Sequence, residues 1–108
     1  MILAKPEILR QIRDGRIKFE PYDEERITLP EDVCGWLNSR SRFARIGLMS
    51  HIAAPFLAPG ISNRQILEIY NAGRNKIRLA PGMRICHVVL QECRGTATYT
   101  GAWKDQEL

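Results

Sequence analysis

The second half of the chain alternates apolar and polar residues, and Pro-Gly turns interrupt this alternation. From residue 50 onward, a period of two residues runs through SHIAAPFLAPGIS (50–62), RQILEIYNAG (64–73) and NKIRLAPGMRICHVVLQEC (75–93). A period of two is typical of β-strands, and Pro-Gly pairs are typical of the turns that join them. The pattern therefore predicts antiparallel β structure that forms part of a sandwich or barrel.

The first half is expected to hold two short helices. Residues 1–15 predict the first, because Pro6 suits a first helical turn and Gly15 suits the end of a helix. The second is predicted over 41–48, where Ser41 can cap the helix. The chain is thus predicted to be mainly β, with a short N-terminal helix and one short helix near 41–48.

The stretch LPEDVCGWLNSR (29–40) fits two structures. Val33, Trp36 and Leu37 have helical spacing, and Pro30 followed by two acidic residues resembles a helix start. The same residues also fit a short strand that leads into the arginines beyond them. Local sequence leaves this choice open.

Length and composition bound the class of protein. A chain of 108 residues fits a single domain, 1–108, in which 1–20 forms a helix and a strand and 96–108 forms a closing tail. No apolar run approaches the ~18 residues that would suggest a membrane span. The N-terminus lacks the pattern of a signal peptide. A cytoplasmic protein without a membrane or nucleic-acid partner is expected.

Arginine is the preferred cation, with twelve Arg against four Lys and a net charge of +4. The planar guanidinium group can bind two oxygens of a phosphate or carboxylate. Arg40, Arg42 and Arg45 surround Ser41 at a predicted helix start, where backbone N–H groups favour an anion. This arrangement predicts a phosphate site. A solvated basic face is the alternative, since many surface helices carry three arginines.

The cysteines argue against two kinds of site. Cys34, Cys86 and Cys93 are odd in number, and none of them is spaced as C-x-x-C. This spacing excludes a disulfide framework and a structural zinc site from the prediction. The H-x-E and P-C-x-x-C patterns of zinc-dependent nucleoside deaminases are also absent. The three thiols are expected to be small core residues, and no metal held by protein side chains is predicted.

Glu68 is the most unusual residue of the β half. In a strand it would share a face with Ile66 and Tyr70, and both faces of this segment are substantially apolar. A carboxylate inside a partly dry pocket can serve as a general base or proton shuttle. A solvent-facing position at a sheet edge is the alternative, and the pattern alone favours it.

The two histidines have less specific surroundings. His87 lies on an apolar face with Ile85 and Val89, which is typical of a core or interface histidine whose hydrogen bonds are satisfied. His51 lies where the arginine-bearing helix meets the next strand. It can orient its neighbours there, but its spacing does not mark it as a ligand.

Four blocks of the sequence resemble the dCTP deaminase branch of the trimeric dUTPase superfamily. They are LPEDVCGWLNSRSRFARIGL, HIAAPFLAPG, QILEIYNAG and IRLAPGMRICHVVL, and their order and spacing match throughout 28–90. The N-terminal MIL and EILRQIRDGRI are similar to the start of such proteins, and TYTGAWKDQ is similar to their closing segment. The resemblance implies a distorted jelly-roll, a dUTPase-like β-sandwich that assembles as a homotrimer with active sites between subunits.

The same resemblance implies a reaction. The expected partner is a deoxynucleoside triphosphate (dCTP, dUTP or dTTP) that carries Mg²⁺ on its phosphates, with no zinc. The implied chemistry is hydrolytic deamination of dCTP to dUTP and ammonia. Water must lose a proton to attack C4 of cytosine, and N3 must gain one, so one carboxylate can do both in sequence.

The implied site residues lie on three segments and the tail. Glu68 is the implied general base and proton shuttle, and Ser41 and Arg45 are the other implied catalytic residues. The implied nucleotide-binding residues are Arg40, Ser41, Arg42, Arg45, Ile52, Ala53, Ala54, Ile66, Leu67, Glu68, Tyr99 and Gln106.

The chain departs from the family pattern at several positions. It passes from IKFEPYDEER directly to ITLPEDV, where the family carries a Gly-Ser/Asp-Leu-Arg block and several strands. Arg42 replaces a serine, Ala58 replaces an aspartate expected to hold the deoxyribose, and Ala102 replaces a lysine before the tail aromatic Trp103. Each lost charged hydrogen bond should weaken nucleotide binding by roughly 1–3 kcal/mol. The missing strands should expose sheet edges that a partner must cover.

Three functions remain open on these grounds. A deaminase that uses Glu68 is favoured. A catalytically impaired nucleotide-binding or regulatory relative is supported by Ala58, Ala102 and the internal gap. A pyrophosphatase that acts like dUTPase ranks last, because the aspartate of that chemistry would fall nearest to Ala58.

Overall fold

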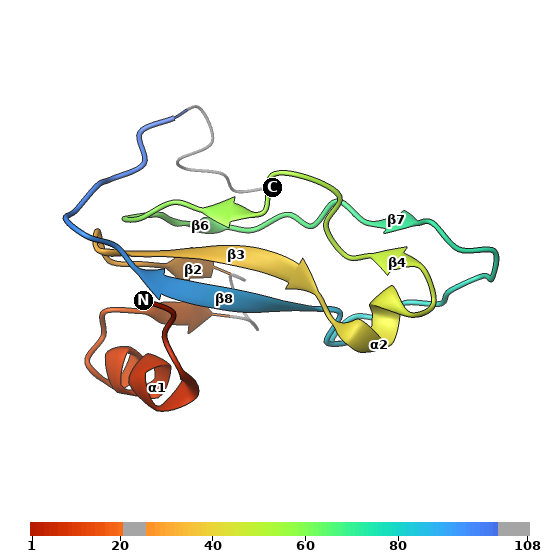
Figure 1. Cartoon of the computed structure of the whole chain (residues 1–108), viewed down its shortest axis with the longest axis horizontal. Coiled ribbons are helices and arrows are strands. Elements are labelled where there is room, and N and C mark those ends of the chain that lie inside the picture. The colour runs from red at the N-terminus through yellow and green to blue at the C-terminus, as the bar shows by residue number, and fades with distance from the viewer. Residues whose placement is uncertain (21–25, 102–108) are drawn as a thin grey trace.

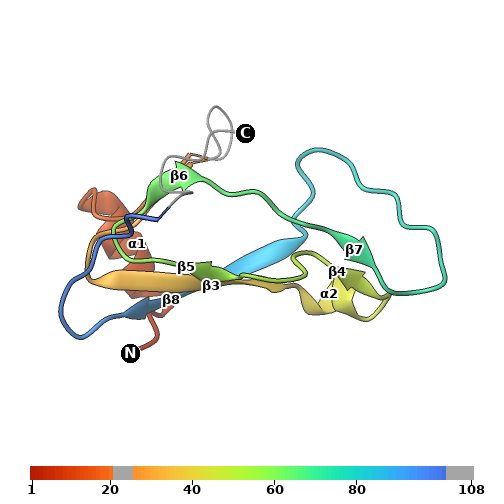
Figure 2. The ribbon, with the colours of Figure 1, turned by 90° about the horizontal axis from the view of Figure 1, so that it is seen from above.

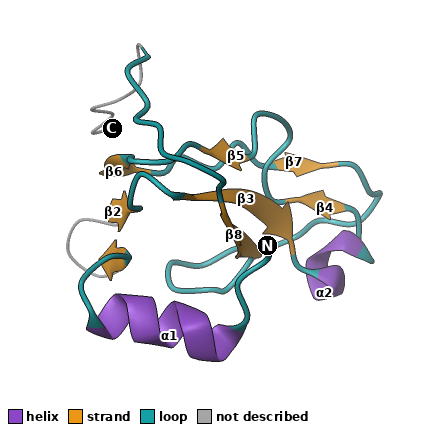
Figure 3. Cartoon of the chain, turned by 60° about the vertical axis from the view of Figure 1, so that its left-hand side comes forward, coloured by secondary structure: helices purple, strands orange, loops and turns teal. Residues whose placement is uncertain are grey.

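A computed structural model describes residues 1–20 and 26–101 of the chain. This part is mainly β, with antiparallel sheets and two helices, consistent with the predicted β-sandwich (Figures 1 and 3). The helices are α1 (Lys5–Arg13) and α2 (Ser41–Ala44). The strands are β1 (Lys18–Glu20), β2 (Arg26–Thr28), β3 (Val33–Ser39), β4 (Leu48–Met49), β5 (Phe56–Leu57), β6 (Ser62–Arg64), β7 (Tyr70–Asn71) and β8 (Cys86–Glu92).

Two three-stranded sheets enclose the core. One has the strand order β1-β2-β6 and the other β5-β3-β8, and all their pairings are antiparallel. Figure 2 shows β6 in one layer and β3 with β5 and β8 in another. Residues from both sheets and their connections, among them Val33, Leu57, Ile61 and Leu90, form one buried cluster. Each sheet thereby covers the apolar face of the other, as a sandwich requires.

The ambiguous segment 29–40 forms a strand. β3 pairs with β8 along its whole length, from Val33 opposite Glu92 to Ser39 opposite Cys86, while β5 occupies its other edge. Pro30 and the two acidic residues form the turn before the strand, in which the Val33 N–H donates to the Pro30 carbonyl at 3.2 Å. A helix here would leave both neighbouring strands without a partner, so tertiary pairing outweighs the local helical spacing.

The N-terminal helix was predicted correctly within 1–15. Pro6 lies in its first turn, and Gly15 follows its end with a φ of 77°. The residues before the helix extend the sandwich, because the Leu3 N–H donates to the Leu90 carbonyl at 2.8 Å. The start of the chain is thus attached to the free edge of β8.

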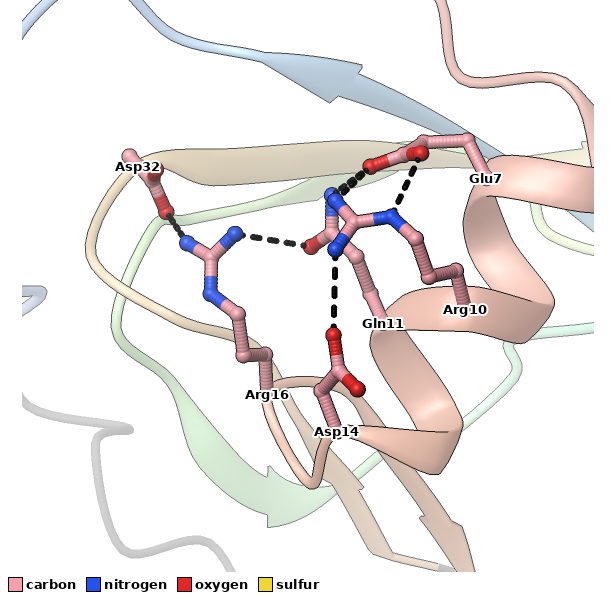
Figure 4. A network of polar contacts seen from close by, with 6 residues as sticks. All are labelled: Glu7, Arg10, Gln11, Asp14, Arg16 and Asp32. Atoms are coloured by element: carbon pink, nitrogen blue, oxygen red, sulfur yellow. Dashed lines mark hydrogen bonds and ion pairs between the residues drawn. The ribbon is translucent and has the colours of Figure 1, made fainter.

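A polar network attaches the end of α1 to the turn before β3. Its members are Glu7, Arg10, Gln11, Asp14, Arg16 and Asp32 (Figure 4). Gln11 is only 4% exposed; it donates to Glu7 and accepts from Arg16, which also forms an ion pair with Asp32. The hydrogen bond from Arg10 is the main reason why the pKa of Glu7 is lowered to about 2.

The helix predicted over 41–48 is shorter than expected, and its predicted cap was wrong. α2 contains a single turn, and its N-cap is Arg40, without a side-chain capping hydrogen bond from Ser41. The chain turns away at Gly47, which has a φ of 90° and packs against Gly73. A Cβ at Gly47 would lie 2.6 Å from the Gly73 backbone nitrogen, so this turn excludes a longer helix and a larger residue.

The β half contains less strand than its period of two predicts. The strand β8 and the turn at 80–83 are confirmed, but the strand predicted over 75–79 is absent. Within 64–73 only Arg64 belongs to β6 and only Tyr70–Asn71 form β7, while 65–69 is irregular. In the described part of this single chain, 65–69 and 75–79 have no strand beside them to complete a hydrogen-bonded ladder.

Candidate functional site

A pocket of about 600 Å³ opens beside the turn that joins β5 to β6. Six of its lining residues have aliphatic or aromatic hydrocarbon side chains, and the other lining residues have polar side chains. The lining residues are His51, Ala54, Phe56, Leu57, Ala58, Ile61, Asn63, Gln65, Ile66, Glu68 and Tyr99. A mostly apolar cavity with a few polar groups is the usual form of a small-molecule site.

The segment 65–68 supplies one wall of this pocket. Ile66 and Glu68 line the pocket, whereas Leu67 packs against the buried core cluster. The predicted alternation is therefore present for 66–68 only, because Gln65, predicted to share the face of Leu67, lines the pocket as well, and the segment has no ladder partner. Packing of Leu67 anchors this wall and directs Glu68 toward the cavity.

The backbone around Glu68 is held by hydrogen bonds from both sides. Its N–H donates to Nδ1 of His51 at 3.1 Å, and its carbonyl accepts from the Ile52 N–H at 3.0 Å. Nε2 of His51 lies 3.2 Å from the Ala54 carbonyl. The neutral tautomer with its hydrogen on Nε2 satisfies both contacts of the ring. His51 thus connects the Glu68 wall to the opposite loop.

Ala54 adopts an unusual backbone conformation at the edge of the pocket. Its φ of 54° is left-handed, which is uncommon for a residue with a Cβ and costs roughly 1–2 kcal/mol. The His51 ring, through its contact with the Ala54 carbonyl, helps to hold this conformation. Strained backbone of this kind occurs often at ligand sites.

Glu68 itself is exposed in the single chain, as the alternative interpretation of the sequence predicted. The residue also lines the pocket. In this position it can accept a proton from a water molecule near a ring bound in the pocket. A ligand, the closing tail or a second subunit would have to cover the opening to exclude bulk solvent.

The arginine segment lies outside this pocket. Arg40, Ser41 and Arg45 are exposed on and beside α2 and do not line the cavity, and Arg42 lines a separate groove. The described part of one chain therefore does not bring the arginines and Glu68 into one cavity.

The remaining predicted site residues are spread over three locations. Ala54 and Tyr99 line the pocket, whereas Ile52 and Ala53 are exposed beside it. The Tyr99 N–H donates to the Pro59 carbonyl at 3.2 Å, which places the end of the described chain over the turn. Gln106 lies outside the described residues, as do Ala102 and Trp103.

Several residues that line the pocket were not predicted from the sequence. Asn63 is 5% exposed and its side-chain carbonyl accepts a hydrogen bond from the Gln65 amide at 2.5 Å. Phe56 is half exposed, and its ring packs on Trp36 with centroids 5.4 Å apart. The Pro-Gly turn between Phe56 and Asn63 was the available signal, because a turn between two apolar strands brings their side chains around one cavity.

The cysteines and His87 differ in part from expectation. Cys34 is buried, and Cys86 and Cys93 are half-buried. Burial, with a hydrogen bond that the Cys34 thiol donates to Cys93, raises the pKa of Cys34 to about 11, and burial alone raises the pKa of Cys86. His87 is exposed in the single chain, so it is not a core residue there, and its position at an interface between chains remains a prediction.

The described part of the chain has no cluster of metal ligands and no membrane-spanning helix. Within 1–20 and 26–101, no three His, Cys, Asp or Glu side chains gather into a group that could hold a metal ion. Neither α1 nor α2 in that part of the chain is long and apolar enough to span a membrane.

Comparisons with known proteins agree on one family. A family model described as dCTP deaminase-like matches residues 23–93. Over 73 residues the chain is 45% identical to a dCTP deaminase of Tolumonas auensis. The aligned stretch covers 68% of this chain but only 38% of that relative, so the chain spans less than two thirds of the length of the curated protein it matches.

Proposed function

The chain belongs to the dCTP deaminase-like family, and from this premise we propose that it hydrolyses the amino group of dCTP to give dUTP and ammonia. In this proposal the cytosine ring enters the pocket beside the β5–β6 turn, and Glu68 acts as general base and proton shuttle. The triphosphate is bound by the segment that contains Arg40, Ser41, Arg42 and Arg45. Mg²⁺ arrives on the phosphates and has no protein ligand.

The proposed reaction uses one carboxylate for two proton transfers. Glu68 removes a proton from water while the oxygen attacks C4 of cytosine, and N3 of the ring receives a proton. The proton of the C4 hydroxyl is then passed to the amino group, which leaves as ammonia as the C4–N bond breaks and the C4 carbonyl forms. A single group can serve both steps because it is regenerated in its starting form at the end of the cycle.

The observation that carries this proposal is the placement of Glu68 on a fixed wall of an apolar pocket. Hydrogen bonds to His51 and Ile52 hold its backbone, and Leu67 anchors the wall to the core. Such support keeps a catalytic group within the narrow range of positions that proton transfer requires.

The arginines are proposed to reach the substrate from a neighbouring subunit. Within one chain they lie outside the pocket, and large apolar side chains near it are exposed, namely Ile52, Phe56, Ile69 and Tyr70. Exposed apolar area of this kind is typical of an assembly surface. We propose a homotrimer, in which the pocket of one subunit and the arginine segment of another form one site.

The test is a deamination assay on the purified chain with dCTP and Mg²⁺, followed by loss of cytosine absorbance. Glu68→Gln should remove the activity while leaving thermal unfolding unchanged, because its side chain is exposed and makes no core contact. Glu92→Gln is the matched control, since Glu92 is an exposed glutamate on β8 away from the pocket. Sedimentation would measure the number of subunits. Equal activity of wild type and Glu68→Gln would refute the assignment.

A catalytically impaired nucleotide-binding relative is the second candidate. Ala58 favours it, because this residue lines the pocket and offers no hydrogen bond where the resemblance implies an aspartate. This candidate predicts that dCTP raises the thermal unfolding temperature although neither wild type nor Glu68→Gln releases ammonia. Ala58→Asp would then strengthen nucleotide binding if the deoxyribose lies beside this position.

A further inference from the structure

Two cysteine side chains meet where β3 begins and β8 ends. Figure 1 shows these two strand ends side by side. Cys34 is the second residue of β3 and lies opposite Gln91 of β8. Cys93 directly follows β8, and its N–H donates to the Asp32 carbonyl at 2.7 Å. Because residues two apart on a strand point to the same face, Cys34 and Cys93 are diagonal neighbours on one face of the sheet.

The two thiols are in contact with each other. The Cys34 S–H donates a hydrogen bond to the sulfur of Cys93, and both residues are free cysteines. A disulfide requires its two Cβ atoms to lie about 4 Å apart. Side chains whose sulfurs already share a hydrogen bond need little further movement to reach this geometry. The position of the two residues in the sheet therefore favours a bond between their sulfurs.

The thiols differ in their access to solvent. Cys34 is only 6% exposed, and burial raises the pKa of its thiol to about 11, so this thiol stays protonated near neutral pH. Cys93 is half-buried, so a reagent in solution reaches its sulfur first. The third thiol, Cys86, lies at the opposite end of β8, across from Ser39. The pair thus combines one thiol that can begin an exchange reaction with a neighbour that can complete it.

Cys93 also precedes the segment that leads to the pocket. This segment, 94–99, is attached to the turn before β3, because the Thr98 hydroxyl donates to Oε1 of Glu31 at 2.7 Å. It ends at Tyr99, which lines the pocket and whose N–H is held by the turn between β5 and β6. A covalent bond at Cys93 would therefore fix the start of a segment whose other end forms part of the pocket wall.

We propose that Cys34 and Cys93 are a redox-sensitive pair, which a small-molecule disulfide converts into an intramolecular disulfide bond. The Cys93 thiolate attacks one sulfur of the small disulfide and releases its other half. Cys34 then attacks the Cys93 sulfur of this mixed disulfide, forms the bond between the two residues and releases the second half. The protons of the two protein thiols end on the two released thiols, so one disulfide is reduced as another forms. This reaction does not depend on the proposed deaminase activity.

The bond has two measurable consequences for the fold. It would close residues 34–93 into one loop, and a link across a long loop restricts the unfolded chain far more than the folded one. The oxidised protein should therefore unfold at a temperature about 10 °C higher than the reduced protein. The amide hydrogens of 94–99 should also exchange more slowly after oxidation, because the segment would open less often.

The test treats wild type and Cys86→Ser with oxidised glutathione. Cys86→Ser keeps only the two thiols of the pair, and both should be lost as glutathione is released. A tryptic digest made without reductant should then contain the peptides of Cys34 and Cys93 joined to each other. Wild type should lose the same two thiols and keep Cys86. Cys93→Ser is the matched control and should gain neither the bond nor the rise in unfolding temperature, and Cys34→Ala should behave in the same way.

Three results would overturn the proposal. In the first, the thiols stay free, or glutathione remains attached to Cys93 while Cys34 keeps its thiol, which would mean that the two sulfurs cannot reach bonding geometry. In the second, the disulfide joins two chains and gives a dimer on a non-reducing gel. In the third, the bond forms within one chain but changes neither the unfolding temperature nor the amide exchange of 94–99, so that the pair would have no effect on the fold.

Discussion

The α1 end and the α2 end of this molecule are stabilised in different ways. At the α1 end the helix is attached to the sandwich by Gln11 and by the ion pair of Arg16 with Asp32, next to the fully buried Ile17 (Figure 4). At the α2 end the elements are a single helical turn and the two-residue strands β4 and β7, and charged side chains remain unpaired among the described residues.

This difference separates structural from binding roles. Burial and paired charges contribute to folding, so changes at the α1 end and in the sandwich should lower stability. Exposed, unpaired cations contribute little to folding and remain available to a ligand. The groove lined by Arg42, Lys76 and Arg78 lies at the α2 end, whereas the ion pairs of Arg10 and Arg16 lie at the α1 end. Four measurements would sharpen or break this comparison.

Leu90→Ala should have the largest effect. Leu90 is 0% exposed in the core between the sheets, and truncation of a buried leucine costs about 2–5 kcal/mol of unfolding free energy. Leu79→Ala is the matched substitution in the loop at the α2 end, where Leu79 is 36% exposed, and it should cost less than about 1 kcal/mol. Urea unfolding measures both, and equal losses would contradict the contrast.

Gly47→Ala should have the next largest effect. The new Cβ would meet the Gly73 backbone at 2.6 Å, and the left-handed φ adds strain, so we expect a loss of about 2–3 kcal/mol. Gly15→Ala is the control, since Gly15 also has a left-handed φ but no atom within 4 Å of the added carbon. It should cost about 1 kcal/mol. Thermal unfolding of both variants would separate the steric contact from the backbone strain.

Asp32→Asn should have a smaller effect. It weakens the ion pair between Asp32 and Arg16. Because the two side chains are 34% and 38% exposed, the expected loss of unfolding free energy is about 0.5–1 kcal/mol. The loss should shrink in high salt, because salt screens partly exposed charges. Lys76→Gln, at the α2 end, should leave stability unchanged. A larger loss for Lys76→Gln than for Asp32→Asn would mean that the unpaired cations support the fold.

The smallest effect concerns pH. The hydrogen bond from Arg10 lowers the pKa of Glu7 from 4.5 to about 2. Because this pKa is lower in the folded state, its contribution to stability is fully present above pH 4.5 and is lost as the pH falls toward 2. Glu7→Gln should therefore reduce the change of unfolding free energy with pH between pH 4.5 and about 2. Denaturant midpoints measure the slope, and an unchanged slope would show that another group titrates.

Part of the candidate site was predictable from the sequence. The alternation in QILEIY placed Ile66 and Glu68 on one side and Leu67 on the other, which the structure retains without a strand. Local periodicity specifies which side chains share a face, since it depends on bond geometry alone. Asn63 and Gln65 were missed because their places in the pocket depend on how the turn folds back over the sheet.

The sequence by itself determined that this chain is mainly β, that its first helix lies near the N-terminus, and that it resembles the family which the comparisons later matched. Only the tertiary structure decided that 33–39 is a strand, that α2 stops after one turn, and that Arg42 lies with Lys76 and Arg78 while Glu68 lines a different cavity. The reason is physical. Periodicity and turn residues act between neighbours in the chain, whereas strand pairing, close backbone contacts and converging charges join residues far apart in sequence, whose distance no local pattern contains.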